Sequence, residues 1–109
     1  MKSSAPLLIL LCVLTVLIDM NTLNAQTYKM YVGTYTSGSE SKGVYIYDFD
    51  EKSGNTKFVK TIPMSNPSFL ARNGDILYAV NEDTNGMLTA YDLKNDTILN
   101  QASTAGMHP

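Results

Sequence analysis

Along most of this chain, short runs of hydrophobic residues alternate with short polar segments. Aromatic and β-branched residues occur in short runs that Gly, Ser, Asn and Asp interrupt, which is the pattern of β-strands joined by turns. No run after residue 26 keeps apolar residues at the i, i+3, i+4 and i+7 spacing of an amphipathic helix. We therefore predict an all-β fold. The predicted strands are residues 28–35, 43–49, 57–62, 68–71, 76–80, 87–93 and 97–102.

Two of these strands are apolar almost without interruption. Residues 43–49 and 76–80 are of this kind, and such strands are typically covered on both faces. Residues 57–62 alternate between apolar and polar and are therefore predicted to be half-buried or to lie at a sheet edge. Residues 73–75 (Asn-Gly-Asp) are a strong signal for a tight turn. The many tyrosines on these strands are expected to pack between sheets rather than to stack on a carbohydrate.

The same order of features occurs twice along the chain. Three pairs of motifs mark the repeat, at offsets of 47, 44 and 42 residues: Tyr31-Val32 with Tyr78-Ala79-Val80, Tyr47-Asp48 with Tyr91-Asp92, and Asn66-Pro67 with His108-Pro109. A repeat of about 40–50 residues with four short strands is typical of a β-propeller blade. An ordinary β-meander with tyrosine-rich strands is the alternative explanation.

The two repeats differ in their number of predicted strands. The second has four, between residues 68 and 102, and the first has three, between residues 28 and 62, so that its innermost strand is missing. Propellers use about 4–8 blades, and fewer than two would leave long apolar edges open. We therefore expect the chain to be the beginning of a longer propeller of four-stranded antiparallel blades.

The first 25 residues have the layout of a secretory signal peptide. Lys2 supplies a positive charge, residues 5–18 are an apolar run, and cleavage is predicted before Gln26. A membrane anchor is the alternative, but a spanning helix needs about 20 apolar residues. We therefore expect a signal peptide over residues 1–25 and a partial propeller over residues 26–109. The product would be exported, to the periplasm or the cell exterior, with no stable membrane anchor after cleavage.

Charge and composition exclude several classes of function. The formal net charge is −2, whereas proteins that bind nucleic acid usually carry a basic patch, so no nucleic-acid partner is predicted. Cys12 is the only cysteine and would leave with the signal peptide, and His108 is the only histidine. The processed chain would then have no thiol nucleophile, no disulfide and no multi-histidine metal site of its own. We predict neither a metal nor a cofactor.

Five segments together resemble the opening of the lactonase-type seven-bladed propellers. They are residues 31–36 (YVGTYT), 42–48 (KGVYIYD), 66–71 (NPSFLA), 77–82 (LYAVNE) and 106–109 (GMHP). This family includes the propeller 6-phosphogluconolactonases and the fungal 3-carboxymuconate cyclases, and the resemblance covers residues 28–109. It implies a seven-bladed fold and a small-molecule lactone or sugar-acid substrate. The 109-residue chain alone is expected to be inactive, because most blades that surround the family's central channel are absent from it.

The resemblance implies hydrolysis of a lactone, which needs a water, a general base and donors to the oxyanion. Glu82 follows a strand at a turn and is a candidate catalytic carboxylate, although a solvated loop acid is the simpler interpretation. His108 is a candidate base, because histidine titrates in a useful range; an exposed loop residue is again the simpler interpretation. Arg72 is a candidate for binding a substrate carboxylate or phosphate, or is a plain surface residue before a turn.

Three functions remain open from the sequence. The first is an exported lactonase in carbohydrate metabolism, for which an unphosphorylated lactone fits the export signal better than a cytoplasmic sugar phosphate. The second is a non-catalytic exported propeller that serves as a binding or scaffold module, since fold does not decide function. The third is a small secreted β-protein that pairs its open edges by self-association.

Overall fold

The computed structural model describes residues 26–109, and every regular element within this range is a β-strand. The strands run in chain order as β1 (Thr27–Val32), β2 (Gly43–Asp50), β3 (Thr56–Pro63), β4 (Pro67–Asn73), β5 (Ile76–Asn81), β6 (Met87–Asp92) and β7 (Thr97–Ser103). The all-β prediction is confirmed, and all seven predicted strands are present. The predicted signal peptide, the alternative membrane anchor and Cys12 lie outside the described residues. Within residues 26–109, no helix is long and apolar enough to cross a membrane.

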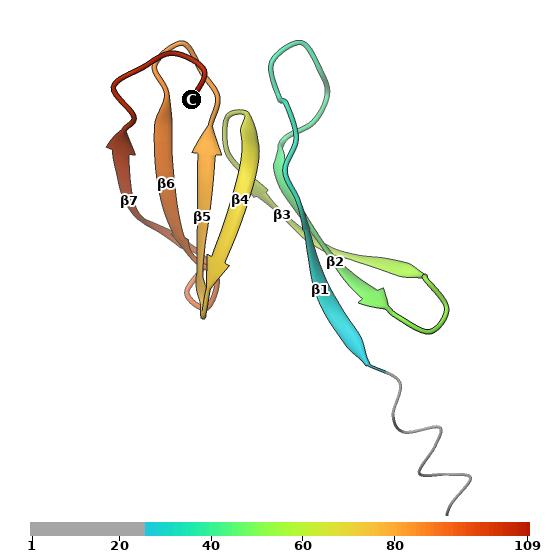
Figure 1. The fold of residues 1–109 in the computed structure, drawn as a ribbon. Helices are drawn as coiled ribbons and strands as arrows, with labels where there is room; N and C mark the ends of the chain where they lie inside the picture. Colours follow the sequence, from blue (N-terminus) through green and yellow to red (C-terminus); the bar gives the residue numbers. More distant parts are fainter. Residues whose placement is uncertain (1–25) are drawn as a thin grey trace, which may run out of the picture.

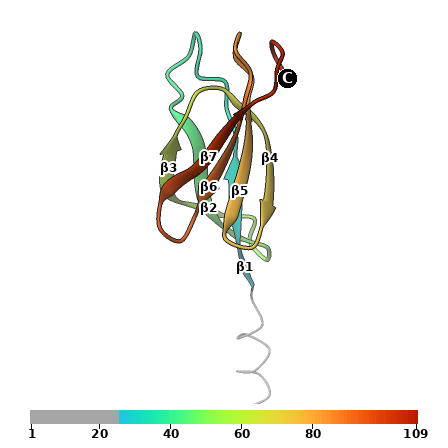
Figure 2. The same ribbon diagram turned by 90° about the vertical axis from the view of Figure 1, so that its left-hand side faces the viewer.

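The strands form two antiparallel sheets in which each strand pairs with its neighbour in the sequence. The first sheet has the order β1-β2-β3 and the second the order β4-β5-β6-β7. Figures 1 and 2 show the two sheets side by side, with the hairpin turns at one end and the longer loops and the C-terminus at the other. The end that carries the longer loops and the C-terminus is called the loop end below, and the opposite end is called the hairpin-turn end. The loop end includes residues 33–42, 82–86 and 104–109.

One predicted strand boundary is wrong by three residues. The strand predicted over residues 28–35 ends at Val32. The reason is a close approach of the backbone at Gly33, where an added Cβ would lie only 2.1 Å from the carbonyl oxygen of Pro67. The chain leaves the sheet at this crossing, and Tyr35 therefore lies in the loop between β1 and β2.

The hydrophobic core lies between the two sheets. Val44, Ile46 and Ile62 of the first sheet pack against Leu77 and Tyr91 of the second. The prediction that residues 43–49 are covered on both faces is only partly right: Val44 and Ile46 are buried, but the tyrosines on the opposite face of β2 are half-buried. The second sheet covers only the face that carries Val44 and Ile46. Strand β3 lies at a sheet edge, as predicted for residues 57–62.

The sequence repeat corresponds to a structural repeat. The pairing of β2 with β3 shifts register between Ile46 and Tyr47, and the pairing of β6 with β7 shifts at the same place, between Ala90 and Tyr91. The residues before the two repeat-ending prolines, Asn66 and His108, have φ of 41° and 47°. Matching bulges and matching left-handed residues distinguish two copies of one unit from an irregular meander.

Candidate functional site

Four side chains from separate elements gather at the loop end. Strand β5 ends at Asn81, which places Glu82 directly after it, and Tyr35 comes from the loop between β1 and β2. Ser68 lies near the start of β4, and His108 lies after β7. The antiparallel register brings Ser68 close to Glu82, because Pro67 at the start of β4 pairs with Asn81 at the end of β5.

The central contact of this group joins the two sheets. The hydroxyl of Tyr35 donates a hydrogen bond of 2.6 Å to Oε2 of Glu82. This bond lowers the pKa of the Glu82 carboxyl, with further lowering from the Ser68 hydroxyl and from the positive charge of His108. The same bond and the negative charge of Glu82 raise the pKa of the Tyr35 phenol. Glu82 is therefore an anion at neutral pH and Tyr35 a protonated donor.

A buried asparagine lies behind this pair. Asn66 is 5% exposed, and its Oδ1 accepts hydrogen bonds from the backbone N–H groups of Thr36 (2.7 Å) and Ser37 (3.0 Å). Its Nδ2 donates to the Ser37 hydroxyl (2.9 Å) and to Oδ1 of Asp83 (2.6 Å). The side chain thus connects the loop that holds Tyr35 with the loop that holds Glu82.

Further hydrogen bonds extend from this asparagine into the second sheet. The Ser65 hydroxyl also donates to Oδ1 of Asp83 (2.9 Å), and Nδ2 of Asn81 donates to the backbone carbonyl of Ser65 (2.6 Å). Thr89, which is buried, donates its hydroxyl to Oδ1 of Asn81 (2.6 Å). Every buried side-chain N or O atom within the described range has a hydrogen-bond partner. The loop end is therefore supported by a continuous polar network that stiffens it.

The three residues predicted as candidates do not all come together. Glu82 and His108 are close enough for the charge of His108 to affect the Glu82 carboxyl, and the backbone N–H of His108 donates to the Asp83 carbonyl (3.0 Å). Arg72 lies near the other end of β4, where its Nε donates to the Gly74 carbonyl (2.8 Å). Its guanidinium lies 5.7 Å from the centre of the Tyr31 ring. Arg72 is therefore separate from the group at the loop end.

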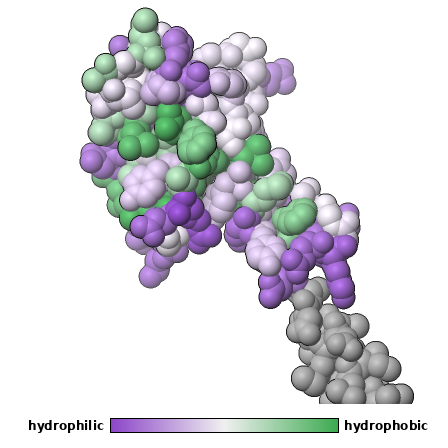
Figure 3. Space-filling model, viewed as in Figure 1, coloured by the Kyte–Doolittle hydropathy of each residue, from purple (hydrophilic) through white to green (hydrophobic). Residues whose placement is uncertain are grey.

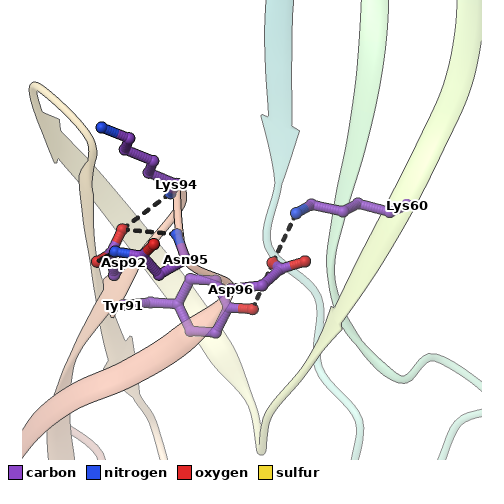
Figure 4. A network of polar contacts seen from close by, with 6 residues as sticks. All are labelled: Lys60, Tyr91, Asp92, Lys94, Asn95 and Asp96. Carbon is purple, nitrogen blue, oxygen red and sulfur yellow. Dashed lines mark hydrogen bonds and ion pairs between the residues drawn. The ribbon is translucent and has the colours of Figure 1, made fainter.

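A second polar cluster joins the two sheets at the hairpin-turn end, as Figure 4 shows. Oδ1 of Asp96 accepts hydrogen bonds from Lys60 of β3 (2.6 Å) and from the hydroxyl of Tyr91 (2.7 Å). Asp92 accepts the backbone N–H groups of Lys94 (2.8 Å) and Asn95 (3.0 Å) and shapes the turn between β6 and β7. Both carboxylates accept at least two donors of the protein, and these bonds hold the β6–β7 turn and the two sheets together.

Tyr35 and Ser68 of the loop-end group, and Asn66 behind it, are not among the candidates predicted from the sequence. The pattern places Tyr35 in a strand with the packing tyrosines, Ser68 at the start of a strand and Asn66 in a repeated motif. A signal for Tyr35 was present: it precedes Glu82 by 47 residues, the same offset that separates Tyr31 from Tyr78. The offset identifies the two residues as equivalent positions of the repeat, whereas their contact follows from the packing of the two sheets.

The chemistry of the loop end is that of a polar binding site. It offers an anionic acceptor, hydroxyl groups and an imidazole within one region, and Tyr35 is 58% exposed. No group of three or more His, Cys, Asp or Glu side chains that could hold a metal ion is found among residues 26–109. Such an arrangement can hydrogen-bond a hydroxylated small molecule and can orient a water beside an anion.

Comparison with known proteins identifies the family to which this chain belongs. The sequence model of the family described as lactonase, 7-bladed beta-propeller, matches residues 29–109. A 6-phosphogluconolactonase of Formosa agariphila is 29% identical over 90 residues, which cover 73% of this chain and 26% of that protein.

Solved structures agree with the sequence comparison. A Bacteroides uniformis protein assigned as a 6-phosphogluconolactonase superimposes with a TM-score of 0.66 at 33% identity, over 76% of this chain and 26% of that one. A Bacteroides fragilis protein with the same assignment gives a TM-score of 0.66 at 35% identity, over 76% of this chain and 25% of its own. This chain spans about a quarter of the length of the proteins that it matches.

Proposed function

Because this chain belongs to the lactonase family of seven-bladed β-propellers, we propose that its gene encodes a hydrolase that opens a sugar-acid lactone in carbohydrate metabolism. The observation that supports this most strongly is the family match, which extends over nearly all of the described residues. The relatives assigned as 6-phosphogluconolactonases support the lactone as the substrate class.

Lactone hydrolysis assigns distinct roles to the residues at the loop end. Water attacks the ester carbonyl, the ring C–O bond breaks, and the proton lost by the water passes to the alkoxide that leaves. Glu82 is a weak base, since its pKa is lowered by Tyr35, Ser68 and His108. We therefore assign the proton transfer to His108, which accepts a proton in its neutral form, and the orientation of the water or of a substrate hydroxyl to the Glu82 anion. Tyr35 holds the carboxylate in place through its 2.6 Å hydrogen bond.

The 109-residue chain by itself is expected to be inactive. Tyr35 is more than half exposed, and only two sheets contribute groups to the site. Oxyanion stabilisation is effective where water is excluded, and this requires walls on all sides of the substrate. In this proposal those walls are further blades of a complete propeller.

The substrate is proposed to be an unphosphorylated lactone. Residues 1–25 are proposed to be an export signal, which would separate the protein from sugar phosphates of the cytoplasm. Arg72, the predicted binding residue for a carboxylate or phosphate, is remote from Glu82 in the structure, since it lies beside the turn at Gly74. A phosphate is thus not accounted for by the side chains at the loop end.

The experiment is a hydrolysis assay on the protein translated from the complete reading frame that contains this sequence. 6-Phosphogluconolactone and its unphosphorylated counterpart are compared, and we expect faster turnover of the unphosphorylated lactone. Glu82→Gln is expected to lower kcat/KM by at least about tenfold, because it removes the anion that orients the reacting groups. Glu40→Gln is the matched control, since Glu40 is exposed in the loop between β1 and β2; its kcat/KM should stay within about twofold of wild type.

Each result of this assay has a definite meaning. No hydrolysis of either lactone would contradict the enzyme and favour the binding or scaffold module. Hydrolysis that Glu82→Gln leaves unchanged would uphold the lactonase and remove Glu82 from its site. Preference for the phosphorylated lactone would contradict the choice of substrate.

A further inference from the structure

Asn66 has a backbone conformation and a set of hydrogen bonds that few other residues could combine. Its φ is 41°, in the left-handed region that costs most side chains free energy and that Asn tolerates better than most. The residue is nevertheless buried, and both ends of its carboxamide are hydrogen-bonded. A buried residue with a left-handed backbone and hydrogen bonds at both ends of its side chain fixes the positions of the segments that it contacts.

The first set of contacts holds the loop that presents Tyr35. Oδ1 of Asn66 accepts two backbone N–H groups directly after Tyr35, those of Thr36 and Ser37. The backbone N–H of Asn66 donates in return to the Thr36 hydroxyl (3.1 Å). Because the two residues that follow Tyr35 are fixed, the direction in which its ring leaves the backbone is fixed too.

The second set of contacts holds the segment that presents Glu82. The backbone N–H of Glu82 donates to the carbonyl of Asn66 (2.9 Å). Nδ2 of Asn66 donates to Oδ1 of Asp83, the next residue (2.6 Å). Asn66 therefore binds residues next to both Tyr35 and Glu82, although these two lie in loops that follow strands of different sheets.

We propose that Asn66 is a positioning residue that sets the distance between the Tyr35 hydroxyl and the Glu82 carboxylate, and through this pair the activity of the loop-end site. The effect on activity rests on the proposed lactonase function, whereas the effect on the pair does not. Asparagine is required because its two ends are used differently. Aspartate would lack the donor to Asp83, and alanine would leave the N–H groups of Thr36 and Ser37 without their acceptor.

The matched pair of variants for the test is Asn66→Gly and Asp96→Gly. Both positions have positive φ, which glycine adopts freely, and both side chains bridge the two sheets. Asp96 lies at the hairpin-turn end, where it bonds Lys60 and Tyr91. Both substitutions therefore remove bridging hydrogen bonds without backbone strain, but only Asn66→Gly removes them beside Glu82.

The measurement is an NMR titration of glutamate side-chain carboxyls in the complete 109-residue chain, labelled with ¹³C-glutamate. The chain has three glutamates, Glu40, Glu51 and Glu82, so three signals are expected, and Glu82→Gln assigns the one of interest. The pKa of Glu82 is expected to rise toward the ordinary value in Asn66→Gly, because the donor Tyr35 is no longer held against it. Asp96→Gly should leave the Glu82 titration unchanged.

A Glu82 titration that is equal in wild type and Asn66→Gly would overturn the proposal. If Asn66→Gly fails to fold, the rise of the Glu82 pKa that Tyr35→Phe causes is compared between wild type and Asn66→Asp, because the charge added at position 66 is then present in both members of the second pair. A smaller rise in the Asn66→Asp background supports the proposal, and an equal rise overturns it. No substrate is used, so a protein without lactonase activity would leave this test intact. In a complete protein that is active, Asn66→Gly is expected to lower kcat/KM in the direction of Glu82→Gln and to add little when combined with it.

Discussion

Tyr91 shows how a single residue can serve both the core and a polar bridge. Its ring belongs to the buried cluster between the sheets, and it is 8% exposed. Its hydroxyl donates to Asp96, which also accepts Lys60 from the other sheet. Burial, followed by the hydrogen bond and the charge of Asp96, raises the pKa of Tyr91 from 10.0 to about 12. The phenol is therefore protonated in the folded chain at pH 10 and below.

This raised pKa predicts a loss of stability at alkaline pH. A group whose pKa is higher in the folded chain stabilises the fold fully below its unfolded pKa and loses this contribution as the pH rises toward the folded value. Denaturant midpoints measured from pH 9 to 11 are therefore expected to fall most steeply above pH 10, between the two values for Tyr91. Tyr91→Phe should be less stable by about 1 kcal/mol at neutral pH and should show a shallower alkaline fall, in which only the contribution of Tyr35 remains. Tyr28→Phe, at a half-exposed position, should retain the full fall; an identical alkaline fall in Tyr91→Phe would contradict the assignment.

Among the strands, the local sequence pattern accounts for the position of most, whereas a contact between elements accounts for the end of β1. The alternation and apolar runs between residues 43 and 102 were sufficient to place six strands to within about two residues. The exception, β1, ends early because its chain meets the start of β4 at Gly33. Nothing in the pattern around Gly33 contains that information, since Pro67 is distant in sequence.

The crossing at Gly33 predicts a large effect from a small substitution. In Gly33→Ala the new methyl group would lie 2.1 Å from the Pro67 oxygen and 3.3 Å from its carbon, both of which are backbone atoms. The two sheets would have to separate locally, and the free energy of unfolding should fall by about 1–3 kcal/mol. Gly106→Ala is the control, because its methyl group would meet nothing within 4 Å. Chemical denaturation of both variants is the measurement, and equal stability of the two would contradict the crossing.

At the scale of the whole molecule, the outer face of the second sheet repeats the covered face of the first. Tyr78 is equivalent to Tyr31, Leu88 to Val44 and Ala90 to Ile46, at the offsets of the sequence repeat. Tyr31, Val44 and Ile46 are packed against the second sheet, whereas Leu88 is 39% exposed. Figure 3 shows hydrophobic side chains gathered over the four-stranded sheet. Since the chain belongs to a seven-bladed family, we expect a further blade to cover this face in a complete propeller.

This equivalence predicts that the cost of a charge at Leu88 depends on the length of the protein. In the 109-residue chain, Leu88→Asp should lower the free energy of unfolding by less than about 1 kcal/mol, because the side chain is partly in water. In the complete protein it should cost about 3 kcal/mol or more, as for a buried unpaired charge. Leu99→Asp, on edge strand β7 and 52% exposed, should have a small effect in both. Equal effects of Leu88→Asp in both proteins would show that no blade covers this face.

The all-β class, the repeat, nearly all strands and the family follow from the amino-acid sequence alone, because alternation, turn residues and repeat offsets are local properties of the chain. It also proposed Glu82 and His108, which the structure brings together. Three facts emerge only in the folded chain: Tyr35 donates to Glu82, Asn66 holds both of their loops, and Arg72 lies apart. These facts depend on the packing of one sheet against the other. Side chains separated by 30 or 47 positions meet only when that packing forms, and no local pattern specifies its side-chain geometry.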